Sequence, residues 1–190
     1  MDYQTYFGEI GAQHNLAYFC TKYQIEQGRG DRVAFRWIYP DLTRENITFQ
    51  EFEQKSNQCA HLLKDLGVGE GDRAFTFVPR SPELFYFFLG ILKNKAVAGI
   101  LFSNFGEEAL LDRLGDSKAR FLLTSKSFLR KIKAIWEELP ALEKVLLVDS
   151  EVHESERVLS LPRLMKGTSD TFEIPQTDPE TPSIIHYTSG

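Results

Sequence analysis

Residues 96–102 read AVAGILF, seven consecutive positions without a charged or polar side chain. A short apolar run of this kind is typical of a strand that is buried on both faces of a parallel sheet. The residues that follow predict a helix over 107–114 and another strand over 120–123. Strand, helix and strand in succession indicate an α/β fold in which right-handed crossovers connect parallel strands.

Two helices with clear start signals precede this run. Thr48 and Glu51 have the spacing of a capping box, which predicts a helix over residues 49–66. Ser81 is expected to cap a second helix, with proline in its first turn, where a missing N–H costs nothing. Between the two helices, residues 73–78 predict a strand.

The outer parts of the chain extend the same pattern less regularly. A helix is expected over residues 12–27, and residues 33–39 and 46–48 are expected to pair as a hairpin. Downstream lie a predicted helix over 125–138, a strand over 144–148 and a last strand over 183–187. The residues between these last two strands are charged and contain proline, with one helical patch at 161–166, and they predict an excursion over the surface.

The sequence therefore predicts an α/β fold with a mostly parallel sheet flanked by helices. Four parts are expected: an N-terminal helix and hairpin (1–45), the α/β core (46–148), the surface excursion (149–181), and the last strand with the polar residues after it (182–190).

Composition limits the classes of function. A chain of 190 residues with 42% hydrophobic residues can bury one sizeable core. A formal net charge of −5 argues against nucleic acid as the main partner. Cys20 and Cys59 form no disulfide framework or metal pattern, and are expected to be small buried residues in a reducing compartment. Because no secretion signal or membrane span is seen, the expected location is the cytoplasm.

Polar groups follow several predicted strands, at 78–81, 101–104, 123–125 and 187–190. Ligands of open α/β sheets bind beyond the carboxyl ends of the strands, although each of these polar groups alone is also compatible with an ordinary helix cap. Arg130, Lys131 and Lys133 form a basic cluster on a predicted helix, either as a solvated face or as an anchor for a ligand phosphate. His186 lies in the last strand, either lining a pocket or packed in the core.

Six blocks of sequence then carry a resemblance to a known family. The blocks are ITFQEF at 47–52, LGVGEGDR at 66–73, PRSPEL at 79–84, LFSNFGEEA at 101–109, DRLGDS at 112–117 and IHYTSG at 185–190. Together they resemble the AMP-forming acyl-CoA synthetases of the adenylate-forming ANL superfamily, and in particular the acetyl-CoA synthetase branch.

This resemblance implies a two-step ligase. A carboxylate attacks the α-phosphate of ATP to give an acyl-adenylate and pyrophosphate, and the thiol of CoA then displaces AMP. ATP, Mg²⁺ and CoA are the implied substrates and cofactors, with Mg²⁺ and oriented loop donors offsetting the phosphate charge. The small-molecule carboxylate is the other implied partner.

The resemblance also implies roles for particular residues. Thr188, Ser189 and Gly190 would begin the loop that holds the β- and γ-phosphates of ATP. Near the nucleotide end of CoA it implies a set of five residues: Phe102, Ser103, Asn104, Arg130 and Lys133. Asn104 and Lys133 depart from the glycine and arginine that are frequent there in acetyl-CoA synthetases. It implies no catalytic residue and no metal ligand within the chain.

Two further departures concern the turn before the apolar run and the length of the chain. Lys95 stands in a segment, LKNKAV, where the family usually has a glycine-containing turn. Family members also continue well beyond position 190, where the rest of the phosphate loop, the acyl pocket and the catalytic lysine lie. The chain is therefore expected to be an inactive N-terminal portion that needs the remainder of its polypeptide.

Alone, the portion is expected to expose apolar surface and to self-associate. Two alternatives stay open: a non-catalytic binding module with the same fold, and an adenylating enzyme for another carboxylic acid.

Overall fold

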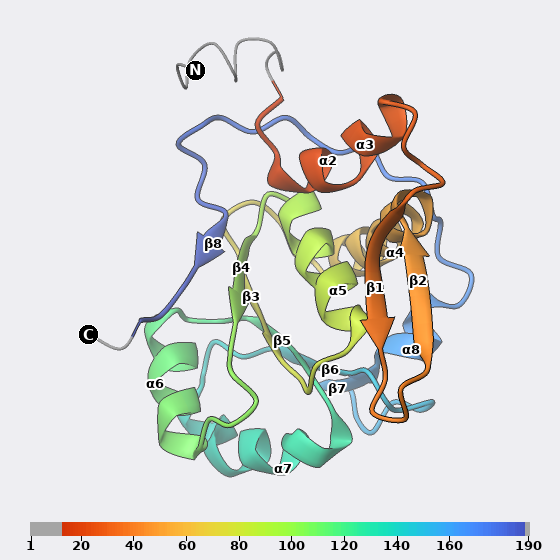
Figure 1. Ribbon diagram of the computed structural model, residues 1–190. Coiled ribbons are helices and arrows are strands. Elements are labelled where there is room, and N and C mark those ends of the chain that lie inside the picture. Colours follow the sequence, from red (N-terminus) through yellow and green to blue (C-terminus); the bar gives the residue numbers. More distant parts are fainter. Residues whose placement is uncertain (1–12, 189–190) are drawn as a thin grey trace.

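The computed structural model describes residues 13–188 (Figure 1). Its centre is a six-stranded sheet with the order β7-β6-β5-β3-β4-β8, and all neighbouring strands in it are parallel. The predicted α/β class is thus confirmed. The strands are β3 (Arg73–Phe77), β4 (Val97–Ile100), β5 (Phe121–Thr124), β6 (Lys144–Leu147), β7 (Val158–Ser160) and β8 (Ile184–Ile185).

Helices cover both faces of this sheet (Figure 1). On one face lie α4 (Phe49–Asp65), α5 (Pro82–Lys93) and the short α8 (Leu161–Met165). On the other lie α6 (Glu107–Asp116) and α7 (Lys126–Ile135), which continues as the 3₁₀ turn η1 (Trp136–Glu138).

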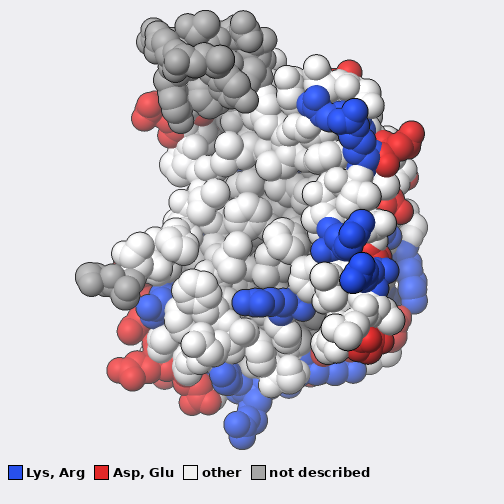
Figure 2. All heavy atoms as spheres, viewed as in Figure 1, with Lys and Arg blue, Asp and Glu red and all other residues white. Residues whose placement is uncertain are grey.

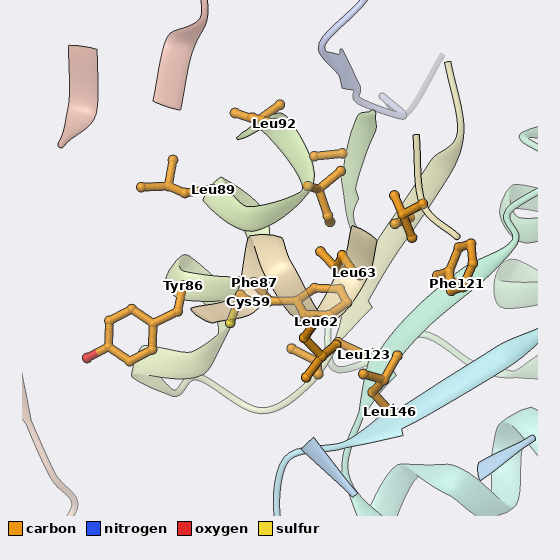
Figure 3. Close-up of a cluster of buried hydrophobic side chains, with 14 of the residues drawn as sticks. Cys59, Leu62, Leu63, Tyr86, Phe87, Leu89, Leu92, Phe121, Leu123 and Leu146 are labelled. Carbon is orange, nitrogen blue, oxygen red and sulfur yellow. The ribbon is translucent and has the colours of Figure 1, made fainter. Parts of the chain in front are cut away.

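Successive residues of a strand pack into the cores on opposite faces of the sheet, because side chains alternate between the two faces. Phe121 and Leu123 of β5 belong to the core under α4 and α5, whereas Leu122 belongs to the core under α6 and α7. Figure 3 shows the first of these cores, where Leu63 of α4 and Phe87 of α5 lie near the sheet residues. All five side chains are fully buried.

Helix α4 begins where the sequence predicts. The Thr48 hydroxyl accepts the backbone N–H of Glu51, and the Glu51 carboxylate accepts the N–H of Thr48, so the capping box is confirmed. Before it, β1 (Val33–Ile38) and β2 (Arg44–Thr48) form the predicted antiparallel hairpin.

A buried ion pair joins α4 to α5. The side chain of Lys93 is 0% exposed, and its ammonium lies 2.7 Å from a carboxylate oxygen of Glu53. The ammonium also donates to the Ser56 hydroxyl at 2.8 Å and to the Asn57 amide oxygen at 2.6 Å, so its three N–H groups have three acceptors. Burial lowers the pKa of Lys93, and the Glu53 carboxylate opposes that shift.

The helix predicted over residues 12–27 is wrong as a single element. The described part contains α2 (Leu16–Cys20) and α3 (Lys22–Glu26), separated at Thr21, where the backbone leaves the helical region at φ −132° and ψ −84°. The Thr21 hydroxyl donates to the carbonyl oxygen of Ala17, a local bond that competes with a regular helix. Cys20, expected to be buried, is exposed, whereas Cys59 is buried.

Strand β4 is shorter than the apolar run that predicts it. It spans Val97–Ile100, and Ile100 and Phe102 are 40% and 55% exposed. On its β8 side the strand is paired only at Ala98 and Gly99, so within residues 13–188 the backbone of the later residues has no strand partner there.

The region 149–181, predicted as a surface excursion, contains a sheet strand that the pattern did not reveal. This strand, β7, pairs in parallel with β6 and buries the side chains of Val158 and Ser160. The predicted helical patch in the same region corresponds to α8. No helix within residues 13–188 is long and apolar enough to cross a membrane.

Candidate functional site at the carboxyl edge of the sheet

The carboxyl ends of the parallel strands meet at one edge of the sheet, where α/β proteins bind ligands. The chain leaves β3 toward α5 on one face, whereas it leaves β4 and β5 toward α6 and α7 on the other. Loops that diverge in this way open a crevice between strand ends. The predicted site residues 102–104 and 188 follow the carboxyl ends of β4 and β8.

The hydroxyl of Thr124, at the end of β5, is taken up by a hydrogen bond within the fold, and the hydroxyl of Ser81, after β3, is buried. The Thr124 hydroxyl donates to the carbonyl oxygen of Phe77 at 2.7 Å and ties the two strand ends together. Ser81 does stand at the N-cap of α5, but its hydroxyl makes no capping bond and is buried without a partner. The predicted Ser81 cap is thus wrong in its hydrogen bond.

The loop after β4 presents its polar groups to the outside. Phe102, Ser103 and Asn104 are all exposed, and the Phe102 ring packs edge-on against Phe105 with 5.4 Å between centroids. Lys131 of α7 donates to the carbonyl oxygen of Phe105 at 2.7 Å, which fixes the base of the loop. The three exposed residues stay accessible to a ligand.

The structure does not bring Arg130 and Lys133 to this loop through any contact among the described residues. Both are exposed, and Lys133 pairs with Glu154 at 3.2 Å, in the segment before β7. The member of the basic cluster that reaches the loop is Lys131. Its position three residues after Phe128, which packs on the core, is the signal that could have selected it.

The exit of β8 leads to the predicted phosphate loop. Thr188 is exposed, and Ser189 and Gly190 lie outside the described residues. His186 is also exposed, so its interpretation as a packed core histidine is wrong.

Tyr187, between these two exposed residues, points the other way and packs against the core under α6 and α7. Its hydroxyl lies 2.7 Å from a carboxylate oxygen of Asp116 and 3.1 Å from the carbonyl oxygen of Arg113. Burial, and then the bond to Asp116, raise the pKa of Tyr187, so the phenol remains a donor at neutral pH. The exit of β8 is therefore tied to α6.

The described residues offer other features that do not add to this edge. Within residues 13–188, no group of three or more His, Cys, Asp or Glu side chains could hold a metal ion. A hollow of about 420 Å³ lies between His14, Leu92, Ala96 and Pro182. It adjoins the amino ends of β4 and β8, opposite the strand exits, so it is not part of this site.

Comparison with known proteins now identifies the family. The family model for AMP-binding enzymes matches residues 22–190. The chain belongs to this family. Its curated relatives include acetyl-coenzyme A synthetases from Bacillus subtilis, 36% identical over 93% of the chain, and from Rubrobacter xylanophilus, 33% identical over 95%. The 3-hydroxypropionyl-coenzyme A synthetase of Metallosphaera sedula is 28% identical over 95% of the chain.

This member of the AMP-binding family spans only about 30% of the length of those relatives. The solved structures that share its fold include two at 24% identity. One is the anthranilate CoA ligase AuaEII in complex with anthranoyl-AMP, with a TM-score of 0.81 over 96% of this chain and 33% of that one. The other is an acyl-CoA synthetase from Brucella canis, with a TM-score of 0.82 over 94% of this chain and 32% of that one.

Proposed function

We propose that this chain is the N-terminal portion of an ATP-dependent, AMP-forming ligase that joins acetate or another short-chain acid to CoA. The main support is the similarity to acetyl-coenzyme A synthetases across nearly the whole chain. The parallel pairing of β8 with β4 adds to it, since with this pairing the chain leaves β8 toward Thr188 at the carboxyl edge of the sheet, where ligands of α/β folds bind.

In the proposed reaction, a carboxylate oxygen forms a bond to the α-phosphorus of ATP, and pyrophosphate leaves. The sulfur of CoA then attacks the acyl carbon, loses its proton, and displaces AMP. Thr188, Ser189 and Gly190 are proposed to contribute a hydroxyl and backbone N–H groups to the β- and γ-phosphates. Phe102, Ser103 and Asn104 are proposed to face the nucleotide of CoA, for which their exposure is a precondition.

The other proposed ligands fit less well. Arg130 and Lys133 lie on the surface of α7, and Lys133 forms an ion pair with Glu154. We propose that they contact CoA where the ligand extends past α7. Mg²⁺ would offset phosphate charge, but residues 13–188 bring no set of ligands together for it. We therefore assign no Mg²⁺ ligand to them. The cytoplasm stays a prediction from the sequence.

The test uses the full polypeptide that the gene encodes. With acetate or propionate present, it is expected to exchange labelled pyrophosphate into ATP, and to form a thioester once CoA is added. Residues 1–190 alone are expected to show no exchange, because the remainder of the phosphate loop and the catalytic lysine are proposed to follow position 190. Exchange that needs a different acid would reassign the substrate.

A second candidate function is an adenylating enzyme for another carboxylic acid. The relative named for 3-hydroxypropionate and the fold shared with the anthranilate CoA ligase favour it. A full polypeptide that catalyses no exchange with any acid in a broad panel would instead indicate a non-catalytic module.

A further inference from the structure

Arg113 of α6 lies between two aromatic rings that come from different strand exits. Its guanidinium carbon is 4.5 Å from the ring centroid of Phe105 and 5.8 Å from that of Tyr187. Phe105 ends the loop after β4, and Tyr187 directly precedes Thr188. One side chain therefore contacts the residue directly next to each of the two segments that are proposed to bind ligands.

Stacking, more than hydrogen bonding, sets the position of this guanidinium. One terminal nitrogen of Arg113 donates to the carbonyl oxygen of Ala109 at 3.0 Å, whereas the Nε atom is buried and has no hydrogen-bond partner. Planar guanidinium groups are suited to packing on aromatic faces. The Phe105 side of the stack is itself fixed, because Lys131 holds the Phe105 carbonyl oxygen.

The residues that follow β8 need a side-chain attachment of this kind to hold them in place. The strand has two residues, and among the described residues it pairs only with β4. Its backbone therefore offers few hydrogen bonds to hold the residues that follow. The bond from the Tyr187 hydroxyl to Asp116 supplies a second, charge-assisted attachment directly before Thr188.

We propose that Arg113, Tyr187 and Asp116 form a positioning unit that holds the start of the phosphate loop in register with the loop of residues 102–105. The inference rests on the proposed function, because only then do the two loops carry the triphosphate of ATP and the nucleotide of CoA. None of the three residues needs to touch a substrate. Their role is to align two binding segments across the end of α6.

The first variant, Tyr187→Phe, removes the hydroxyl and keeps the ring. In the full polypeptide, the KM for ATP in pyrophosphate exchange is expected to rise roughly tenfold, the size of effect that a hydrogen bond to a charged group supports. The KM for the acid is expected to stay unchanged. Tyr39→Phe is the matched control, since it also removes a hydroxyl bonded to a carboxylate, Glu45, but on the distant hairpin.

The second set of variants separates positioning from general damage. Asp116→Ala is expected to raise the KM for ATP by no more than Tyr187→Phe does, because it leaves the Tyr187 hydroxyl with the carbonyl oxygen of Arg113 as an acceptor. The double variant is expected to raise it no further than Tyr187→Phe alone, because the bond to Asp116 is lost in both single variants. Asp116→Asn keeps an acceptor oxygen and should restore most of the affinity. Arg113→Lys keeps the charge and loses the planar stack, so it should raise the KM for both ATP and CoA.

Hydrogen exchange of backbone amides over residues 184–188 provides a readout that does not depend on activity. It is expected to quicken in Tyr187→Phe and to stay unchanged in Tyr39→Phe. Unchanged exchange together with an unchanged KM for ATP would overturn the proposal, as would additive effects of Tyr187→Phe and Asp116→Ala. A wild-type polypeptide without any acid-dependent activity would refute the proposed function, while the amide exchange would still decide whether Tyr187 holds β8.

Discussion

At the scale of single residues, Lys95 shows how the fold keeps a turn without the residue that best suits it. The segment before β4 lacks the glycine expected there, yet the turn is present, with Lys95 at φ +57°. Its N–H donates to the carbonyl oxygen of Leu92, which closes α5. A residue with a Cβ atom pays about 1–2 kcal/mol for this left-handed conformation.

Replacing Lys95 by glycine is therefore expected to raise the free energy of unfolding, by about 0.5–1 kcal/mol after the greater freedom of glycine in the unfolded chain is counted. Urea denaturation measures this difference. Lys95→Ala is the control, because it keeps the backbone strain and removes only the long, exposed ion pair with Glu70. Equal stabilisation by both variants would assign the effect to the charge and contradict the argument.

At the scale of elements, the packing of β4 on β3 depends on one missing side chain. The ring of Phe75 lies where a Cβ atom on Gly99 would be, at a distance of 2.0 Å from the nearest ring carbon. Phe75 is fully buried and cannot move toward solvent without opening the core under α6 and α7. Gly99 is required here by close approach.

Gly99→Ala is accordingly expected to lower the free energy of unfolding by about 2–3 kcal/mol, the upper part of the range for overpacked cores. Gly69→Ala gives a matched control, because no atom lies within 4 Å of the added methyl group and the backbone is not in the left-handed region. It should change the thermal midpoint little. Equal midpoints for the two variants would show that Phe75 relaxes freely.

Elements with strong local signals are the ones that the sequence predicts well. The capping box at Thr48 and the apolar residues of β3 and β5 specify their structure within a few positions. The local sequence does not predict β7, because its three residues form a strand only by pairing with β6. The choice of Lys131 over its neighbours in the basic cluster likewise depends on where Phe105 lies, a fact of tertiary packing.

At the scale of the whole molecule, one face has unusually few charges. Figure 2 shows mostly uncharged atoms over the region where Figure 1 places β8 and β4. Ile100 at the end of β4, Phe102 two residues later and Ile184 of β8 are 40%, 55% and 49% exposed. An uncharged face beside a strand edge is a surface that usually becomes covered.

Residues 1–190 on their own are expected to self-associate through this face. Light scattering over a range of concentrations should show a mass above 21.8 kDa, the mass of one chain. Ile184→Lys places a charge on the strand edge and should shift the mass toward the monomer. Leu42→Lys, at an even more exposed position on the hairpin (78% against 49% for Ile184), should have no such effect. A monomer at high concentration in the unaltered chain would contradict this expectation.

The buried pair of Lys93 and Glu53 has a consequence for how this molecule can vary. Replacing either partner alone leaves the other charge buried and unpaired, which lowers the free energy of unfolding by about 3–5 kcal/mol. Exchanging both for well-packed apolar residues can be neutral. The two positions, one on α4 and one on α5, are therefore free to change only in concert. Any descendant of this sequence that loses the lysine is expected to have lost the glutamate as well.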